Sequence, residues 1–128
     1  MTAALGLPAF LAIGLGAALG AWARYGLSIW LNPQHHALPL GTLVANLLGG
    51  LLVGLAVGLL ERTPGLDPIW RLAIVTGFLG ALTTFSTFSL EAVMMIARGH
   101  FAWALGHSFL HLVGSIAAAA LGLKIING

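Results

Sequence analysis

The chain has 128 residues, of which 59% are hydrophobic and 6% charged, with a formal net charge of +2 and no cysteine. Soluble domains carry about 25% charged residues, so this inventory cannot cover a surface that faces water, whereas it suits a lipid bilayer. The few basic side chains are spread along the chain and form no nucleic-acid-binding patch. The lack of cysteine excludes disulfides and thiolate metal sites.

Four apolar runs have the length of about 20 residues that crosses a bilayer as a helix. The first has no Lys or Arg before Arg24, so it lacks the charged start of a signal peptide and is predicted to be a genuine span. Short polar loops separate the runs, and we expect successive helices to be antiparallel neighbours. The predicted spans are 8–31, 40–60, 69–97 and 101–126, in one all-α transmembrane domain over residues 1–128.

The basic residues of the loops give almost no preference for one orientation in the membrane. One side carries Arg62, Arg71 and Lys124, and the other carries Arg24 and Arg98. Either a single loop or the terminal amine decides the orientation, or the protein inserts both ways up, which would permit an antiparallel dimer. Because four helices leave few residues to wall off a polar path, we expect a homo-oligomer if the protein transports anything.

Rows of small or polar residues at every fourth position mark one face of three spans. Small residues let membrane helices approach closely, which predicts helix packing along these faces. The rows are Ala12, Gly16, Gly20 and Arg24 in the first span, Thr42, Asn46, Gly50, Gly54 and Gly58 in the second, and His107, His111, Ser115 and Ala119 in the fourth.

The polar members of these rows have more than one interpretation. Asn46 either joins helices or faces an aqueous cavity. Arg24 lies near the end of its span, where an interfacial anchor is the default role. His107 and His111 have the spacing of a helical metal pair, but with no HExxH motif and no third ligand nearby, hydrogen bonding or packing is favoured. His111 is also a candidate for a polar path.

The stretch "TGFLGALTTF", residues 76–85, breaks the rules of helix formation inside a span. Its glycines and the pair Thr83–Thr84 lower helix propensity. A helix interrupted at membrane depth must be buried or line water, and its freed carbonyls can bind a cation while its freed N–H groups can bind an anion. A kinked, packed helix whose hydroxyls bond back to its own carbonyls is the alternative. We expect the third helix to be broken near its middle.

Two phenylalanines and a carboxylate follow the expected break. Phe85, Phe88 and Glu91 are spaced three apart, so they lie close together on one helix face. Paired aromatics in a span usually face lipid or the core, but inward-turned ring edges, which are partially positive, could stabilise a small anion. Glu91 cannot face lipid without a large cost, so we expect it to meet hydroxyl groups, to be protonated, or to mark a pathway.

These motifs together resemble the Fluc (CrcB) fluoride channel family. The stretch "GFLGALTTFSTFSLE", residues 77–91, is similar to the family signature and is the most specific of the motifs. "GAALGAWARY" (16–25), "GTLVANLLGG" (41–50) and "HLVGS" (111–115) are similar to the motifs of the first, second and fourth helices, so the resemblance covers all four spans.

The resemblance implies a passive, fluoride-selective channel that exports fluoride across the cytoplasmic membrane and protects against fluoride toxicity. It implies an antiparallel, dual-topology homodimer with two anion pores. The broken third helices would meet at the dimer centre and hold a structural Na⁺ through the backbone carbonyls of Gly80 and Thr83.

The resemblance also implies roles for individual residues. Phe85 and Phe88 would line the pore, and the amide of Asn46 would donate to the ion. Arg24 would lie near the pore vestibule, and the roles of His107 and His111 stay open. Further polar contacts to the anion would come from Thr42, Ser86, Thr87 and Ser115, with Glu91 beside them.

Physical reasoning agrees with a fluoride path, because a tightly hydrated anion needs hydrogen-bond donors in place of water but no fixed cation that would trap it. The second hypothesis is a proton-coupled exporter of the small multidrug type, which would need a carboxylate in its first span, where this chain has none. A third is a helical scaffold without transport activity. No nucleophile–base–acid set favours an enzyme.

Overall fold

The computed structural model describes residues 6–32 and 38–128, and all regular structure in these ranges is helical. Helix α2 spans Leu7–Leu31 and α3 spans Leu40–Glu61. The third membrane segment is made of α4 (Pro68–Arg71), the π-helix η1 (Leu72–Leu79), α5 (Gly80–Leu82) and α6 (Ser86–Ala97). Helix α7, Phe101–Asn127, is the fourth segment.

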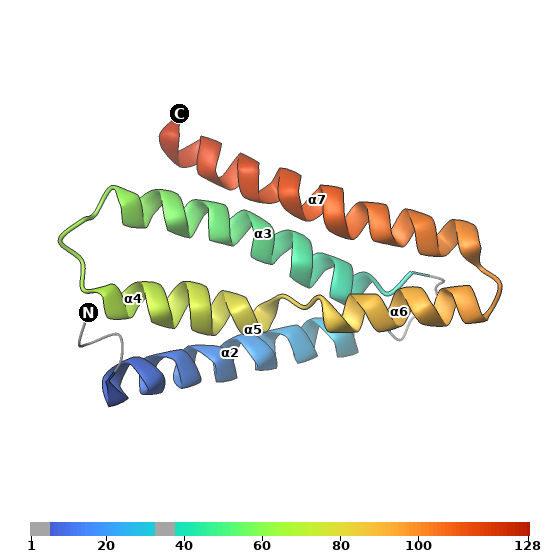
Figure 1. Ribbon diagram of the computed structural model, residues 1–128, viewed down its shortest axis with the longest axis horizontal. Helices are drawn as coiled ribbons and strands as arrows, with labels where there is room; N and C mark the ends of the chain where they lie inside the picture. Colours follow the sequence, from blue (N-terminus) through green and yellow to red (C-terminus); the bar gives the residue numbers. More distant parts are fainter. Residues whose placement is uncertain (1–5, 33–37) are drawn as a thin grey trace.

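Within these ranges, four segments are long and apolar enough to cross a membrane: Leu7–Leu31, Leu40–Glu61, Pro68–Ala97 and Phe101–Asn127. This finding confirms the prediction of an all-helical chain with four spans. The helices run along the long axis of the molecule, with α2 beside the third segment and α3 beside α7 (Figure 1).

The turn between α6 and α7 brings two distant stretches of sequence to the same depth. Gly99 adopts a φ of 80°, a conformation that only glycine reaches at little cost. Its N–H donates to Ile96 O at 2.9 Å and the N–H of His100 donates to Met95 O at 2.8 Å, which is the Schellman pattern of a helix end. Residues equally far before and after Gly99 are thereby placed side by side.

The glycine rows lie where helix backbones touch, which confirms the packing predicted for them. A Cβ atom on Gly54 of α3 would collide with the carbonyl oxygen of Ala119 in α7. A Cβ on Gly16 of α2 would collide with the carbonyl oxygen of Ala73 in η1. The chain therefore packs as two close helix pairs, α3 with α7 and α2 with the first half of the third segment.

The helix of the third segment is interrupted over a shorter stretch than the sequence indicated. Residues 77–82 are helical, and Thr83, with ψ of 157°, is extended, so the stretch between α5 and α6 consists of Thr83, Thr84 and Phe85. Residues 76–82 were expected to belong to the helix-breaking stretch, and this prediction is wrong for them. Gly77 instead packs against α2, since a Cβ there would lie 2.6 Å from Ile13 O.

Hydroxyl groups of this segment also bond back to its own carbonyls, as the alternative interpretation expected. Thr83 Oγ1 donates to Leu79 O at 2.9 Å, and Ser89 Oγ donates to Phe85 O at 2.8 Å. These bonds give both hydroxyls an acceptor within their own segment.

Large apolar side chains cover the outside of the helices. Leu15 on α2 is 70% exposed and Leu105 on α7 is 75% exposed. Such a surface is stable in hydrocarbon and not in water.

Candidate functional site

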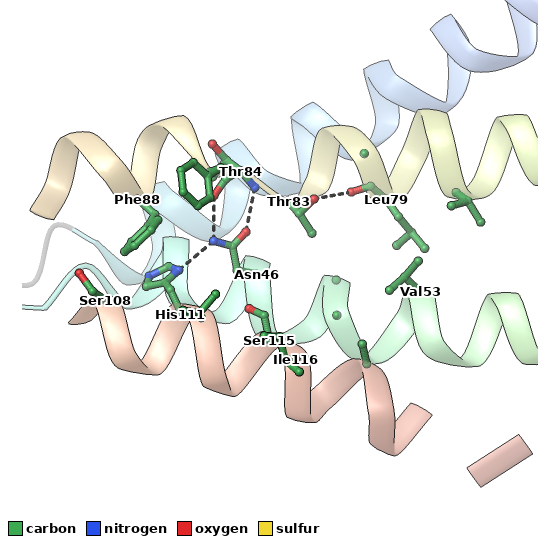
Figure 2. A pocket seen from close by; sticks show the side chains of 17 residues that line it. Asn46, Val53, Leu79, Thr83, Thr84, Phe88, Ser108, His111, Ser115 and Ile116 are labelled. Carbon is green, nitrogen blue, oxygen red and sulfur yellow. Dashed lines mark hydrogen bonds between the residues drawn. The ribbon is translucent and has the colours of Figure 1, made fainter. Parts of the chain in front are cut away.

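The side chain of Asn46 binds the backbone where the third segment leaves its helical path. Asn46 lies on α3 and is buried. Its Oδ1 accepts from the N–H of Thr84 at 2.8 Å, and its Nδ2 donates to Thr84 O at 2.9 Å (Figure 2). One amide therefore satisfies both polar groups of the Thr84 backbone, which would otherwise be unpaired at membrane depth. The structure thus supports the role of Asn46 in joining helices.

The same amide fixes the tautomer of a histidine on another helix. A backbone N–H can only donate, so the contact with Thr84 N assigns the oxygen and nitrogen of the Asn46 side chain. Its Nδ2 also lies 2.8 Å from Nδ1 of His111 on α7, so Nδ1 must accept that bond. The proton of the neutral His111 ring is therefore on Nε2, which is buried and has no partner among the described residues.

Aromatic rings continue from this histidine along α6. Phe88 stacks on His111 with ring centroids 4.6 Å apart and an interplanar angle of 23°. Phe85 meets Phe88 edge to face, with centroids 5.4 Å apart and an angle of 77°. The predicted proximity of Phe85 and Phe88 is confirmed, and His111 joins them as a third ring.

A cavity of about 650 Å³ opens between α3, α7 and the third segment. Figure 2 shows Asn46, Phe88, His111 and Ser115 around it, contributed by three different helices. Among the residues singled out from sequence, its lining contains Asn46, Phe85, Phe88, His111 and Ser115, together with Gly80 and Thr83. Ser108, which the sequence analysis missed, also lines it.

Thr42 and Glu91 lie in a neighbouring polar cluster, outside the cavity lining. Thr42 Oγ1 donates to Oε2 of Glu91 at 2.6 Å, and the other carboxylate oxygen, Oε1, is 3.1 Å from Nε2 of His107. The expectation that Glu91 would meet hydroxyl groups is confirmed at Thr42. The ring centroids of His107 and His111 are 4.3 Å apart. Because His111 lines the cavity, this cluster adjoins it.

No third ligand was expected near the histidine pair, and this prediction is wrong. Glu91 lies close enough to His107 and His111 for one ligand atom from each to fall within 4.8 Å of the others. A signal existed in the sequence, because Glu91 and His107 lie eight positions before and after Gly99, at which the chain reverses.

The hydroxyls of Ser86 and Thr87 lie outside the cavity lining, at the start of α6. Thr84 Oγ1 accepts from the N–H of Thr87 at 3.1 Å and lies 3.4 Å from Ser86 Oγ. The hydroxyl of Thr84 thus accepts from an N–H at the start of α6, while the backbone of Thr84 bonds to Asn46. Sequence reasoning missed this role, although a threonine three residues before a free helical N–H is a capping signal.

Arg24 lies outside the cavity lining and contacts the carbonyl end of α5. Its Nε donates to Ala81 O at 3.0 Å, and its side chain is partly buried. A cation at a helix C-terminus interacts favourably with the unpaired carbonyls there. The guanidinium therefore joins α2 to the interrupted segment.

Two backbone carbonyls near the cavity lack the donors that a continuous helix would give them. The N–H of Thr84, the helical donor for Gly80 O, bonds Asn46 instead. The N–H of Thr87, the helical donor for Thr83 O, bonds the Thr84 hydroxyl instead. The oxygens of Gly80 and Thr83 are thus the kind of ligand that a hard cation prefers, so the chain fits the sodium site that the resemblance implies.

Four apolar membrane-spanning segments, three of which line a cavity with aromatic and hydrogen-bonding walls, define a multi-pass protein of the cell membrane. The family model described as CrcB-like protein, Camphor Resistance (CrcB), matches residues 11–123. The chain belongs to this family, as the sequence motifs indicated.

Several similar proteins carry the name fluoride-specific ion channel FluC. The protein from Cupriavidus pinatubonensis is 60% identical over 114 residues, which cover 89% of this chain and 90% of that protein. The protein from Pseudomonas putida is 53% identical over 117 residues, covering 91% of this chain and 92% of that one. The protein from Aromatoleum aromaticum is 50% identical over 122 residues, covering 95% and 93%.

Proposed function

We infer that this protein is a fluoride-specific ion channel of the cell membrane, and that fluoride passes Asn46, Phe85, Phe88 and His111. Family membership and the names of the relatives support the activity. The observation that carries the assignment of the path is the convergence of these four residues on one cavity from three helices. An ion channel is not an enzyme class, and this conclusion needs no catalytic set.

The groups around the cavity suit a small anion that must shed water. The Nε2–H of His111 is a buried donor without a partner in the described structure, and the hydroxyls of Ser108 and Ser115 are further donors. The partially positive ring edges of Phe85 and Phe88 add weak attraction. Several weak sites without a fixed cation allow the ion to enter and to leave, which conduction requires.

Both amide hydrogens of Asn46 are already donated, one to Thr84 O and one to His111 Nδ1. We therefore propose that Asn46 acts on fluoride mainly by orienting His111, and that it donates to the ion directly only after releasing that ring. The path would then be held in shape by residues beside it, namely Thr42 and Glu91 in the neighbouring polar cluster and Ser86 and Thr87 at the start of α6.

A passive channel explains the polar contacts better than a proton-coupled exporter of the small multidrug type. Such an exporter needs a membrane carboxylate that exchanges protons with a bound substrate. No acidic residue lies in α2, and both oxygens of Glu91 are engaged, by Thr42 and His107. Passive flow would export fluoride down its electrochemical gradient and protect the cell from its toxicity.

We propose that two copies assemble as an antiparallel, dual-topology homodimer with two pores. The nearly equal numbers of Lys and Arg on the two sides support insertion in both orientations. The cavity between the two helix pairs supports a second copy that completes its wall, because a single chain cannot seal a polar path from lipid.

The interruption of the third helix would serve this assembly. The carbonyl oxygens of Gly80 and Thr83 would hold a structural Na⁺ at the dimer centre, where a second copy supplies the remaining ligands. Support comes from the diverted N–H groups of Thr84 and Thr87, which leave these oxygens without helical partners.

Fluoride efflux from liposomes that contain the purified protein, without a pH gradient, tests the activity. We expect efflux of fluoride and none of chloride. Absence of fluoride efflux from a folded, correctly reconstituted protein would overturn the channel assignment, and efflux that appears only with an imposed proton gradient would favour the exporter.

A further inference from the structure

Two histidines and a glutamate form a buried group at the side of the cavity. His107 and His111 are one helical turn apart on α7, with 0% and 4% of their surface exposed, and Glu91 faces them from α6. One ligand atom from each residue lies within 4.8 Å of the other two. Two imidazoles and one carboxylate are a donor set that zinc accepts, with a further position left open.

Atoms of this group remain unpaired although they are deeply buried. His107 Nδ1 and His111 Nε2 have no hydrogen-bond partner within the described residues. Buried polar nitrogens without partners are rare, and they indicate a ligand or a role beyond packing. Here the two orphan nitrogens belong to rings whose centroids are only 4.3 Å apart.

The surrounding residues hold the ligands in place as the outer shell of a metal site does. Thr42 donates to Oε2 of Glu91 and turns Oε1 toward His107. Phe88 stacks on the His111 ring and fixes its plane. Outer partners of this kind orient metal ligands in known sites.

We propose that Glu91, His107 and His111 bind a divalent transition-metal ion of the zinc type, and that the bound ion blocks the anion path. The donor set excludes Mg²⁺ and Ca²⁺ as favoured ions, since both prefer oxygen ligands throughout. Zn²⁺, Co²⁺, Ni²⁺ and Cu²⁺ all accept imidazole with carboxylate. The blocking effect, but not the binding, rests on the proposed channel function.

The tautomer of His111 explains why binding alters the path. If the metal takes Nε2, the ring proton must be on Nδ1, which can then no longer accept from Asn46. If the metal takes Nδ1, it displaces the Asn46 amide directly. Either way the 2.8 Å bond between Asn46 and His111 is lost. A doubly charged ion beside Phe88 would also hold a passing anion too tightly for release.

Metal binding is best measured with Co²⁺, whose visible absorption reports four-coordinate binding, on a chain that keeps only these two histidines. The background variant His35→Gln/His36→Gln/His100→Gln removes the remaining three; His100 is exposed, and His35 and His36 lie outside the described residues. We expect this variant to bind one Co²⁺ per chain, displaced by Zn²⁺. Adding His107→Gln or Glu91→Gln should abolish the absorption band, and adding Thr42→Val should weaken binding by about 10- to 100-fold.

Two outcomes would overturn the metal site. One is the absence of a band in the folded background variant, with folding checked by size exclusion and thermal melting. The other is binding of equal strength after His107→Gln or Glu91→Gln. Glu91→Gln keeps an oxygen that accepts from Thr42, so it separates loss of the ligand from loss of the fold.

Fluoride efflux with and without Zn²⁺ then tests the block. We expect Zn²⁺ to inhibit the background variant at the concentrations that displace Co²⁺. Efflux that Zn²⁺ leaves unchanged, in a protein that binds the metal, would overturn the block. A protein that binds Co²⁺ but never conducts fluoride would instead disprove the channel assignment and leave the metal site standing.

Discussion

Asn46 and Thr84 form a closed pair of hydrogen bonds, with Thr84 N donating to Asn46 Oδ1 at 2.8 Å and Asn46 Nδ2 donating to Thr84 O at 2.9 Å. The pair joins the middle of α3 to the three residues between α5 and α6. It also decides which nitrogen of His111 carries the ring proton. A change at this amide therefore affects both the interruption and the cavity.

Asn46→Asp is expected to slow fluoride efflux strongly. A carboxylate cannot donate to Thr84 O or to His111 Nδ1, and each buried group left unpaired costs about 1–3 kcal/mol. A cost of that size added to the barrier for conduction corresponds to a decrease in rate of about 5- to 150-fold, at about 1.4 kcal/mol per factor of ten. Efflux from liposomes measures it, and an unchanged rate in a folded protein would remove Asn46 from the path.

Phe85→Ile is expected to slow efflux while the protein stays folded. Isoleucine keeps apolar volume but has no ring edge to contact Phe88 or a passing anion. Phe10→Ile is the matched control, because Phe10 lies on α2 and is 68% exposed, away from the cavity lining. Equal efflux rates in the two variants would contradict a role for Phe85 in conduction.

Arg24→Ala is expected to lower the melting temperature in detergent and to reduce efflux. The change removes the bond to Ala81 O at the end of α5, and a hydrogen bond from a charged group contributes about 1.5–3 kcal/mol when shielded from water. Arg98→Ala removes an exposed arginine of the α6–α7 turn and serves as the control. If both variants have the melting temperature of the unmodified chain, the contact with Ala81 does not contribute to stability.

Gly54→Ala is expected to destabilise the packing of α3 against α7. The added methyl group would collide with Ala119 O, and an overpacked core typically loses about 1–3 kcal/mol. At Gly14, by contrast, an added Cβ meets nothing within 4 Å, so Gly14→Ala should leave the melting temperature nearly unchanged. Thermal melting of the two variants side by side makes the comparison.

The sequence predicted the number of membrane spans and their helical character because each apolar run carries its own signal. It also predicted that Phe85 and Phe88 would be neighbours, since spacing within one helix fixes its faces. Contacts between helices were harder to predict. Asn46 was expected either to join helices or to face a cavity, but its partners Thr84 and His111 were not predicted, because hydropathy does not fix how one helix is rotated against another.

The π-helix Leu72–Leu79 and the role of Ser108 were also not predicted. An apolar run of this kind has no pattern that distinguishes a π-helix from an α-helix, and a serine in a span signals a cavity only once its neighbours are known. The glycines of the third segment were read as breaking residues, whereas Gly77 is needed for close approach to α2. Propensity alone could not separate these two uses.

The bonded row from Thr84 through Asn46 to His111 takes one residue from each of the second, third and fourth spans. Without the fourth span Asn46 would have no imidazole to contact, and the carboxylate of Glu91 would have only Thr42. The polar interior is thus completed only when α7 packs against the other segments, so a chain cut before Phe101 would leave these groups without their partners at membrane depth.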